Sequence, residues 1–322
     1  MQAAVITEIG TAPVKRSHPD PAPSPGTTLV RVRAAALNTI DGLIASGRHP
    51  VAVPAVPYVP GIEGAGDVLA SDTFAVGTRV RVAAAGGRVD GTVAELVSAP
   101  DGSCVAIPDE LDYRTAAAIG TVGTSALLTL RERAHLEAGS SVLVLGATGP
   151  FGLAFVQLAR LLGASRVIAA GRDESRLAAA AAAGATEVVT LHSDAPQRLL
   201  EDVVAIGGPV NVVIDPLWGS FAPPALAALT PGGRYVNVGQ EAGVTATIDG
   251  GLLRHAGRVV TGFSGTTASA EAIAGAYLEI AQYARAGTLR LPIREYPLAS
   301  IHDAWNAQLN SPGAKIILLP DA

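Results

Sequence analysis

Three glycines between an apolar run and a helical segment have the spacing that binds a phosphate group. The stretch Ser141–Gly152 reads SVLVLGATGPFG, and a helical pattern follows it. Gly146 permits a tight turn, Gly149 lets the backbone approach a pyrophosphate, and Gly152 lets helix and strand pack closely. The helix start adds free N–H groups and a partial positive charge. We therefore expect a dinucleotide on this loop, contacted by Gly146, Thr148, Gly149, Pro150, Phe151 and Gly152.

The residues after the next apolar run indicate which dinucleotide the loop binds. An NAD enzyme usually carries an acidic residue there, which accepts a hydrogen bond from the ribose 2′-hydroxyl. This chain has Gly171 at that position, followed by Arg172, with Arg176 one helical turn further on. Guanidinium groups offer planar sets of donors that suit a 2′-phosphate, so the sequence predicts NADPH. In the alternative, both arginines lie at a solvated helix start and Asp173 binds the ribose of NAD.

Apolar runs and helical segments alternate around these residues and predict the elements that position them. Unalternated apolar strands joined by helices, such as Leu153–Leu162 and Glu174–Ala183, are typical of a parallel sheet covered on both faces. Six such strands complete a doubly wound sheet, which binds its ligand at the carboxyl ends of the strands. The expected strands are Val142–Leu145, Val167–Ala170, Val188–Leu191, Val210–Ile214, Tyr235–Val238 and Val259–Thr261.

The regions before and after the predicted parallel sheet differ from it in composition and pattern. Residues 1–116 are rich in glycine and proline and contain short β-like runs at Thr28–Val32, Arg79–Val82 and Val93–Val97. Turn signals interrupt these runs, which indicates an irregular β-rich domain. The last region holds an amphipathic helix that ends near Gly287, then a short helix and the strand Lys315–Leu319. We expect this tail to return to the first domain.

Composition argues against several classes of protein. The net charge of −5 and the isoelectric point of about 5.7 disfavour a nucleic-acid partner, which needs a basic surface. Cys104 is the only cysteine, so no intrachain disulfide and no cysteine-rich zinc lobe can form. The sequence shows neither the pattern of a signal peptide nor an apolar run long enough for a membrane span. We expect a cytoplasmic protein with no membrane partner.

Six segments occur in the order and at the spacings of one known family. They are AAALNTID (Ala34–Asp41), VPGIEGAG (Val59–Gly66), GTVAELV (Gly91–Val97), AAIGTVGTSALL (Ala117–Leu128), the glycine loop and the C-terminal GAKIILLP. In these segments the chain resembles the zinc-independent, zeta-crystallin-like quinone oxidoreductases of the medium-chain dehydrogenase/reductase superfamily. The resemblance implies a GroES-like β-rich domain (residues 1–116 and 264–322) with a Rossmann doubly wound NADPH-binding domain (residues 117–263) inserted in it. It also implies an active cleft between the two.

The resemblance indicates that the zinc ligands of the superfamily are missing. Zinc-dependent members bind the catalytic metal through two cysteines and a histidine, and the matching positions here are Asn38, Ile62 and Thr121. Zinc in proteins favours thiolate, imidazole and carboxylate ligands. We therefore expect no metal. Alcohol oxidation is disfavoured as well, because an alkoxide would lack the metal that stabilises it.

The resemblance implies a reductase in which NADPH delivers hydride to a conjugated carbonyl, either a quinone or an enone. Asn38 and Asp41 are expected to line the substrate cleft. Asn38 is either a substrate contact or a satisfied structural amide, and Asp41 is expected to hold its loop rather than act as a base. His49, at a position where many family members carry tyrosine, and Tyr58 are candidate proton donors. A packing or surface role stays open for both, with water as the alternative donor.

Further cofactor contacts are expected by position. Thr124 is expected beside the nicotinamide, with a plain role at a helix start as the alternative. The backbone at the strand ends, at Gly239, Gln240, Phe263 and Ser264, is expected to hold the nicotinamide amide. Lys315 is expected to reach the cofactor or the rim of the cleft, with a surface position as the alternative.

Two other functions stay open. An enoyl-thioester reductase for CoA- or carrier-bound substrates would share the cofactor, but it needs a basic entrance. Arg254 and Arg258 are candidates for it, although we expect both to be solvated arginines without such a role. A non-catalytic NADPH-binding protein would keep the glycine loop without turnover. The resemblance also implies a homodimer, because the family commonly associates through the edge of the Rossmann sheet.

Overall fold

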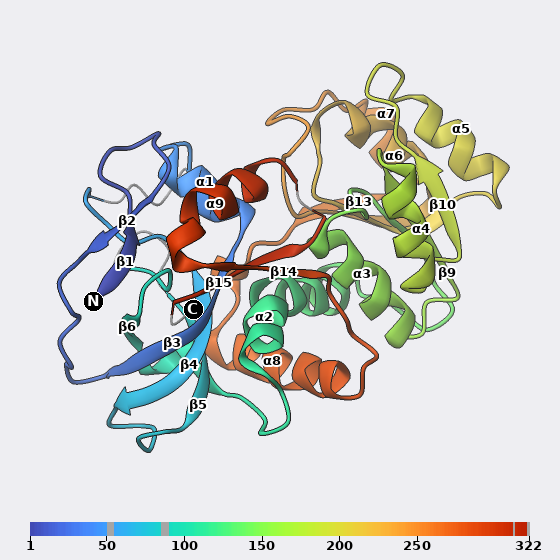
Figure 1. Ribbon diagram of the computed structural model, residues 1–322. Coiled ribbons are helices and arrows are strands. Elements are labelled where there is room, and N and C mark those ends of the chain that lie inside the picture. The colour runs from blue at the N-terminus through green and yellow to red at the C-terminus, as the bar shows by residue number, and fades with distance from the viewer. Residues whose placement is uncertain (50–54, 85–89, 312, 321–322) are drawn as a thin grey trace. The chain divides into compact units, whose positions relative to one another are not determined.

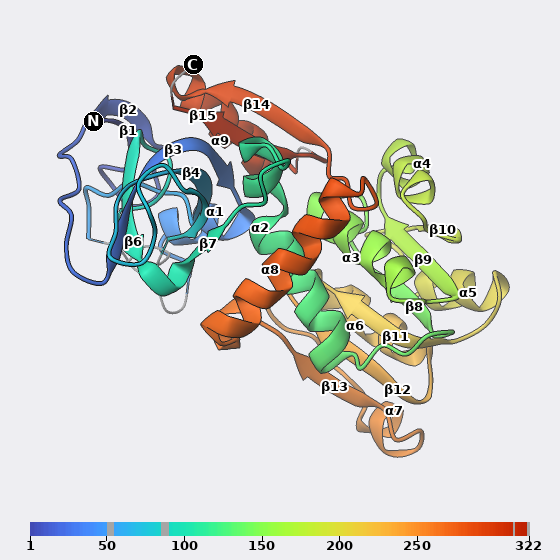
Figure 2. The ribbon, with the colours of Figure 1, turned by 90° about the horizontal axis from the view of Figure 1, so that it is seen from below.

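Parallel strands of the middle region form one sheet in the computed structural model, which describes residues 1–49, 55–84, 90–311 and 313–320. The strands are β8 (Ser141–Val144), β9 (Arg166–Gly171), β10 (Glu187–Thr190), β11 (Val210–Asp215), β12 (Leu229–Asn237) and β13 (Val259–Gly262). Their order is β10-β9-β8-β11-β12-β13, and each neighbouring pair is parallel. Figure 2 shows this row of strands. The order reverses between β8 and β11, as it does in doubly wound dinucleotide-binding sheets.

Helices cover this sheet and explain why its strands are apolar without alternation. Val142, Leu143 and Val144 of β8 have 0% exposed surface, because a strand covered on both faces buries every side chain. Proline suits the first helical position, and one of these helices begins at Pro150. The helices of the region are α3 (Pro150–Leu161), α4 (Glu174–Ala182), α5 (Arg198–Ala205), α6 (Ala222–Ala227) and α7 (Gly250–Arg254).

A second sheet joins the two ends of the chain. Its strands are β3 (Thr27–Leu37), β4 (Glu63–Ala70), β5 (Arg79–Ala83), β6 (Leu96–Pro100), β7 (Cys104–Ala106), β14 (Ile293–Pro297) and β15 (Lys315–Leu319). Their order is β14-β15-β3-β4-β5-β7, and β6 also pairs with β3. In Figure 1 the red strand β15 lies beside the blue strand β3, and the two are antiparallel, with Ile317 opposite Ala36. The C-terminal segment therefore completes the β-rich sheet, as expected.

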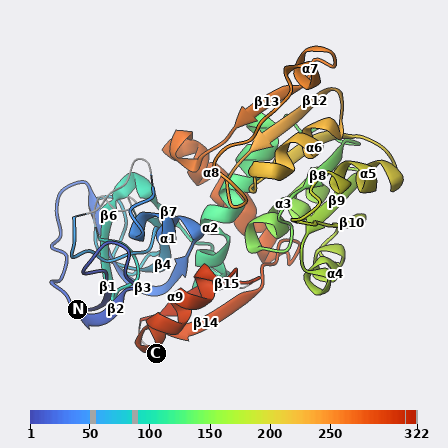
Figure 3. The same ribbon diagram turned by 90° about the horizontal axis from the view of Figure 1, so that it is seen from above.

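Short elements close the core of this β-rich part. Ile301, Ala304 and Trp305 are buried in the same apolar cluster as Ile316 and Leu318 of β15. Figure 3 shows the helix that carries the first three beside β14 and β15. The remaining strands and α-helices are β1 (Gln2–Val5), β2 (Val14–Ser17), α1 (Thr39–Ala45), α2 (Tyr113–Leu128), α8 (Ala270–Arg285) and α9 (Ile301–Leu309). None of the described helices is both long enough and apolar enough to cross a membrane.

Contacts within the chain divide it into two units. The first comprises residues 1–121, 273–287 and 291–322, and the second comprises residues 122–272 and 288–290. These limits differ by several residues from the expected domain boundaries, which stay a prediction.

The expected elements of the Rossmann part are confirmed within one or two residues at most ends, but one expected strand of the β-rich part is wrong in its position. The apolar run Val93–Val97 predicts a strand, whereas β6 begins only at Leu96. Val93 and Ala94 are buried and bond to other segments, with the Val93 N–H donating to the carbonyl of Pro60 and the Ala4 N–H to that of Val93. The run therefore marks burial correctly, but only Leu96 and Val97 lie in β6, and Ala94 forms an isolated β-bridge with Ala3.

Candidate functional site

The glycine loop has the geometry that its spacing predicts. Gly146 has a φ of +60°, which favours glycine. A Cβ on Gly152 would lie 2.4 Å from the carbonyl oxygen of Gly146, so a side chain there would push α3 away from β8. A Cβ on Gly149 would meet nothing closer than 3.8 Å, which leaves open space beside the first turn of α3. The unpaired N–H groups of a first turn bind anions, and this loop therefore fits a pyrophosphate.

The end of β9 presents a cation beside this loop. A Cβ on Gly171 would lie 2.4 Å from Cγ2 of Thr148, so the missing side chain lets the two segments touch. Arg172 is exposed, and Nε of Arg176 lies 3.2 Å from the Asp173 carboxylate. Asp173 also accepts from the backbone N–H of Arg176 at 3.2 Å and so caps α4. Hydrogen bonds from Ser175 and from that N–H hold the pKa of Asp173 below its ordinary value.

A buried carboxyl that the sequence analysis does not predict holds the turn after β11. Asp215 is fully buried and accepts from the N–H of Leu217 at 2.7 Å, from the N–H of Trp218 at 2.9 Å, and from the hydroxyl of Tyr235. Burial raises the pKa of Asp215, against the effect of these hydrogen bonds. The only available signal in the sequence is an acidic residue at the end of an apolar run.

This turn supports two of the predicted cofactor loops. Cγ of Pro216 lies 3.1 Å from the place of a Cβ on Gly146, and the carbonyl oxygen of Pro216 lies 2.6 Å from that of a Cβ on Gly239. Any side chain at either glycine would displace the turn. Asp215 therefore supports these loops indirectly, through its hydrogen bonds to the backbone of the turn.

The remaining predicted contacts on this sheet lie at the same edge, because the carboxyl ends of parallel strands share one edge. Gly239 is held by Asn237, whose Nδ2 donates to its carbonyl at 2.7 Å. The N–H of Phe263 donates to the carbonyl of Asn237 at 3.0 Å, and Phe263 is buried. Gln240 and Ser264 are exposed, and Thr124 is buried on α2. The structure thus brings these strand-end residues together, and their role in cofactor binding stays a prediction.

In the β-rich unit, a buried network surrounds Glu63. Its Oε1 accepts from Nζ of Lys315 at 3.0 Å and from Nδ2 of Asn38 at 2.9 Å. Its Oε2 accepts from the N–H of Thr121 and lies 3.6 Å from Nη2 of Arg81. Burial would raise the pKa of Glu63, but the charges of Lys315 and Arg81, with the hydrogen bonds, hold it below its ordinary value. Glu63 is therefore a buried, ionised carboxylate.

The network changes how Asn38 and Lys315 are understood. Nζ of Lys315 also donates to Oδ1 of Asn38 at 2.6 Å, so both ends of the Asn38 amide have partners within the unit. Lys315 is 3% exposed, so the surface position considered for it is wrong. Its contacts in the structure are with Asn38 and Glu63, and the expected contact with a cofactor stays a prediction.

Asp41 holds the start of α1 and the loop before β4. Its Oδ2 accepts from the N–H of Asn38 at 2.7 Å, and its Oδ1 accepts from the N–H of Ile62 at 3.1 Å. Burial raises the pKa of Asp41 to about 7, against these hydrogen bonds and the charge of Lys315. Tyr58 is buried in the same unit, and His49 is half-buried. The structure brings Asp41 and Tyr58 to one cavity, and the described residues that line it do not include His49.

The positions that match zinc ligands in the superfamily do not fit a zinc ion. Ile62 offers no donor atom, and Oδ1 of Asn38 is occupied by the ammonium of Lys315. The carboxylate beside them, Glu63, already has two cationic partners. A divalent cation at this place would stand against the positive charge of Lys315, so the donor set favours the ammonium over a metal.

Comparisons with known proteins agree with this architecture. Residues 24–109 match the family described as alcohol dehydrogenase GroES-like domain, and residues 150–279 match the one described as zinc-binding dehydrogenase. The fold is thus a GroES-like domain with an inserted Rossmann domain, the architecture of nicotinamide-dependent medium-chain oxidoreductases.

Relatives along the whole chain narrow this class. The chain is 32% identical to a quinone oxidoreductase of Lama guanicoe, over 99% of this chain and 97% of that protein. The structure of the quinone oxidoreductase from Thermus thermophilus, also solved in complex with NADPH, has a TM-score of 0.81 and 29% identity, covering 99% of this chain and 100% of that one. A mycobacterial quinone oxidoreductase has a TM-score of 0.88 and 26% identity, with the same coverage. The chain belongs to the quinone oxidoreductase family: it is an oxidoreductase that uses a nicotinamide cofactor and acts on a small molecule.

Removing the ammonium of the buried network is expected to destabilise the protein. In Lys315→Met, Glu63 keeps only the more distant Arg81 as a cationic partner, so the free energy of unfolding should fall by about 3 kcal/mol. Urea denaturation measures this loss. Lys15→Met, on exposed β2, is the control and should change stability by less than about 0.5 kcal/mol. Equal stabilities of the two lysine variants would contradict the network.

The raised pKa of Asp41 predicts a pH-dependent stability. The folded chain binds this proton more tightly than the unfolded chain, whose aspartate has an ordinary pKa of 3.8. The stability it contributes is fully present below pH 3.8 and is lost as the pH rises through about 7. Over that range wild type should lose up to about 1.4 kcal/mol per pH unit more than Asp41→Asn. Denaturation at several pH values measures the slopes, with exposed Asp72→Asn as control. If Asp41→Asn keeps the slope of wild type, Asp41 is not the titrating group.

Proposed function

We propose that the protein reduces a conjugated carbonyl compound, a quinone or an enone, with hydride from NADPH and without zinc. The observation that carries the proposal is the anion-binding start of α3, with exposed Arg172 at the end of the neighbouring strand β9. The names of the relatives agree with this chemistry, since several are quinone oxidoreductases and one was solved with NADPH.

The preference for NADPH over NADH rests on three residues. Gly171 replaces the acidic side chain that would accept from a ribose 2′-hydroxyl, and Arg172 offers a guanidinium in its place. Asp173 caps α4 and pairs with Arg176, so its carboxylate already has partners and is less suited to bind the ribose of NAD. A 2′-phosphate, which carries about two negative charges, would compete with Asp173 for Arg176.

The bound cofactor would supply the hydride, and the protein would position it. The loop from Gly146 to Gly152 holds the pyrophosphate, and the backbone at Gly239 and Phe263 holds the carboxamide of the nicotinamide. Asn237 fixes these two loops to each other through its backbone and side chain. Thr124, which is buried on α2, would contact the opposite side of the nicotinamide.

A conjugated acceptor makes a metal dispensable, because it spreads the incoming charge onto a distant oxygen. The residues at the matching positions support a zinc-free reaction, since Ile62 has no donor and Lys315 occupies Asn38. The proton that follows the hydride would come from water or from a side chain. Tyr58 and His49 remain candidates, and Asn38, with both ends of its amide bonded, would act through Lys315 and Glu63 rather than on the substrate.

The alternative function, an enoyl-thioester reductase, is less well supported, because one of its two candidate cations has other partners. Arg258 donates to the carbonyls of Leu229, Leu252 and Ala227, so its guanidinium is committed to the fold and is not a rim for CoA phosphates. A homodimer stays part of the proposal, and it is supported by strand β13 at the end of the parallel sheet, where Val259 and Val260 are 38% and 37% exposed.

Charge removal at the proposed 2′-phosphate site should separate the two cofactors. In Arg172→Ala/Arg176→Ala, the Kd for NADPH should rise about tenfold to a hundredfold, because charged hydrogen bonds are lost, whereas the Kd for NADH should change by less than about twofold. Calorimetric titration with each dinucleotide measures both values. Exposed Arg198→Ala, at the start of α5, is the matched control. Equal losses for both dinucleotides would place the 2′-phosphate elsewhere.

A substrate panel tests the reaction itself. Oxidation of NADPH, followed by absorbance, should be faster with 1,4-benzoquinone or a small enone than with crotonyl-CoA, by about tenfold or more in kcat/KM. The opposite order would establish the thioester reductase instead. Binding of NADPH without oxidation by any of the three would establish the non-catalytic alternative. Activity that is lost on chelation and restored by zinc would overturn the zinc-free mechanism.

A further inference from the structure

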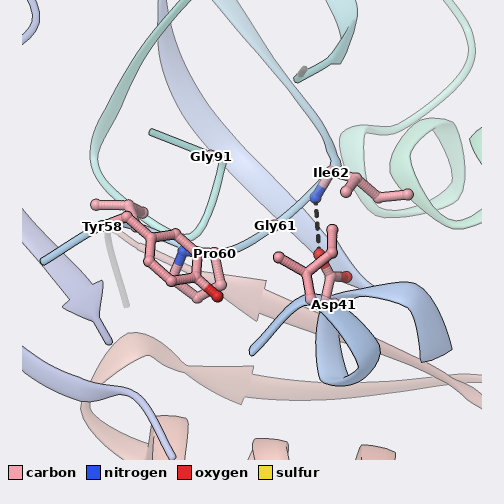
Figure 4. A pocket seen from close by; sticks show the side chains of 8 residues that line it. Asp41, Tyr58, Pro60, Gly61, Ile62 and Gly91 are labelled. Carbon is pink, nitrogen blue, oxygen red and sulfur yellow. Dashed lines mark hydrogen bonds between the residues drawn. The ribbon is translucent and has the colours of Figure 1, made fainter. Parts of the chain in front are cut away.

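A small cavity lies beside helix α1 in the β-rich unit, and the proposed function involves it only through Tyr58, one of its candidate proton donors. It has a volume of about 10 Å³ and is lined by Asp41 and Ile44 of α1, by Tyr58, and by the segment from Val59 to Ile62 with Gly91. Figure 4 shows the side chains of Asp41 and Tyr58 at this cavity. A volume of this size holds about one water molecule, provided that the water finds polar partners.

Two glycines close the wall of the cavity. Gly61 has a φ of +108°, and a Cβ on it would lie 2.7 Å from both Oγ1 of Thr92 and Cγ2 of Val93. A Cβ on Gly91 would lie 2.4 Å from the carbonyl oxygen of Gly61. The two backbone segments therefore touch, and no side chain from either of these positions fills the space.

The hydroxyl of Tyr58 is a buried polar group that needs a partner. Tyr58 is 5% exposed, and its hydroxyl has no hydrogen bond to any residue that the structure describes. Its backbone is fixed by two hydrogen bonds with Ile6, at 2.9 and 3.1 Å, so the residue is held in place. Leaving such a hydroxyl unsatisfied costs about 1–3 kcal/mol, whereas a bound water removes most of that cost.

Asp41 supplies the second partner. Each of its carboxyl oxygens accepts one backbone N–H, which leaves a further lone pair on each oxygen. The charges that act on this carboxyl are those of Lys315 of β15, which favours the ionised form, and of Glu63 of β4, which opposes it. Tyr58 faces the same carboxyl and is itself neutral, since burial and the charge of Asp41 raise its pKa to about 12.

We propose that the cavity binds one internal water molecule, which joins the hydroxyl of Tyr58 to the carboxyl of Asp41. The water gives each side chain a hydrogen-bond partner in either protonation state. When Asp41 is ionised, the Tyr58 hydroxyl donates to the water and the water donates to the carboxylate. When Asp41 is protonated, its hydroxyl donates to the water, and the water donates to the oxygen of Tyr58. The hydrogen bonds through the water thus reverse direction when Asp41 gains or loses its proton, and Tyr58 keeps its own proton in both states.

A crystal structure of the full chain and a ¹³C NMR titration of Asp41, with its signal assigned through Asp41→Asn, test the proposal together. Wild type should show one ordered water within hydrogen-bond distance of both side chains. Tyr58→Phe removes one partner of the water, so the ionised form of Asp41 loses the hydrogen bond that the water donates to it. The proton affinity of Asp41 should then rise about threefold or more.

The control removes a hydroxyl of the same kind from another carboxylate. Tyr113 donates directly to Asp67 in the same unit, so Tyr113→Phe should leave the titration of Asp41 unchanged. An empty cavity in the wild-type density overturns the proposal. So does a titration of Asp41 that is the same in wild type, Tyr58→Phe and Tyr113→Phe.

Discussion

The ionised carboxylate of Glu63, which is fully buried, is the constraint on which the β-rich unit depends. A buried charge of this kind is tolerated only when cations and hydrogen bonds surround it. Lys315 comes from the C-terminal strand, Asn38 from the end of β3, and Arg81 from β5, so the network joins three parts of the sheet. The C-terminal segment is therefore held in this unit by the ion pair of Lys315 with Glu63 as well as by the pairing of β15 with β3.

The pKa values of two carboxyls of this unit, both buried, are shifted in opposite directions. The pKa of Glu63 is held low because two cations and two donors compensate its burial. The pKa of Asp41 is raised because its backbone donors and the charge of Lys315 do not. Asp41 lies at a cavity beside Tyr58, whereas Glu63 touches only fixed partners. One residue therefore serves as a permanent charge, and the other as a group that can exchange a proton near neutral pH.

The Rossmann unit follows a different principle, the close approach of backbone to backbone. Gly152 lets α3 approach β8, and Gly146 and Gly239 let the turn after β11 pack against both loops. Asp215 and Tyr235 hold that turn from within the core. The side of the loops that remains open is the side on which we propose that the dinucleotide lies, and Arg172 is exposed at the end of the neighbouring strand.

Much of this was determined by the sequence alone. The period of the apolar runs predicted the parallel strands, and the spacing of Gly146, Gly149 and Gly152 predicted the phosphate loop, because both are local properties of the chain. An apolar run was less informative from Val93 to Glu95, which are not part of the strand that begins at Leu96. Only the tertiary structure decided what the polar residues do. Lys315 and Glu63 are 252 positions apart, and neither the burial of this lysine nor its partner can be deduced from neighbours along the chain. Asp41, Tyr58 and Asp215 likewise acquire their ionisation and contacts from segments that only folding brings beside them.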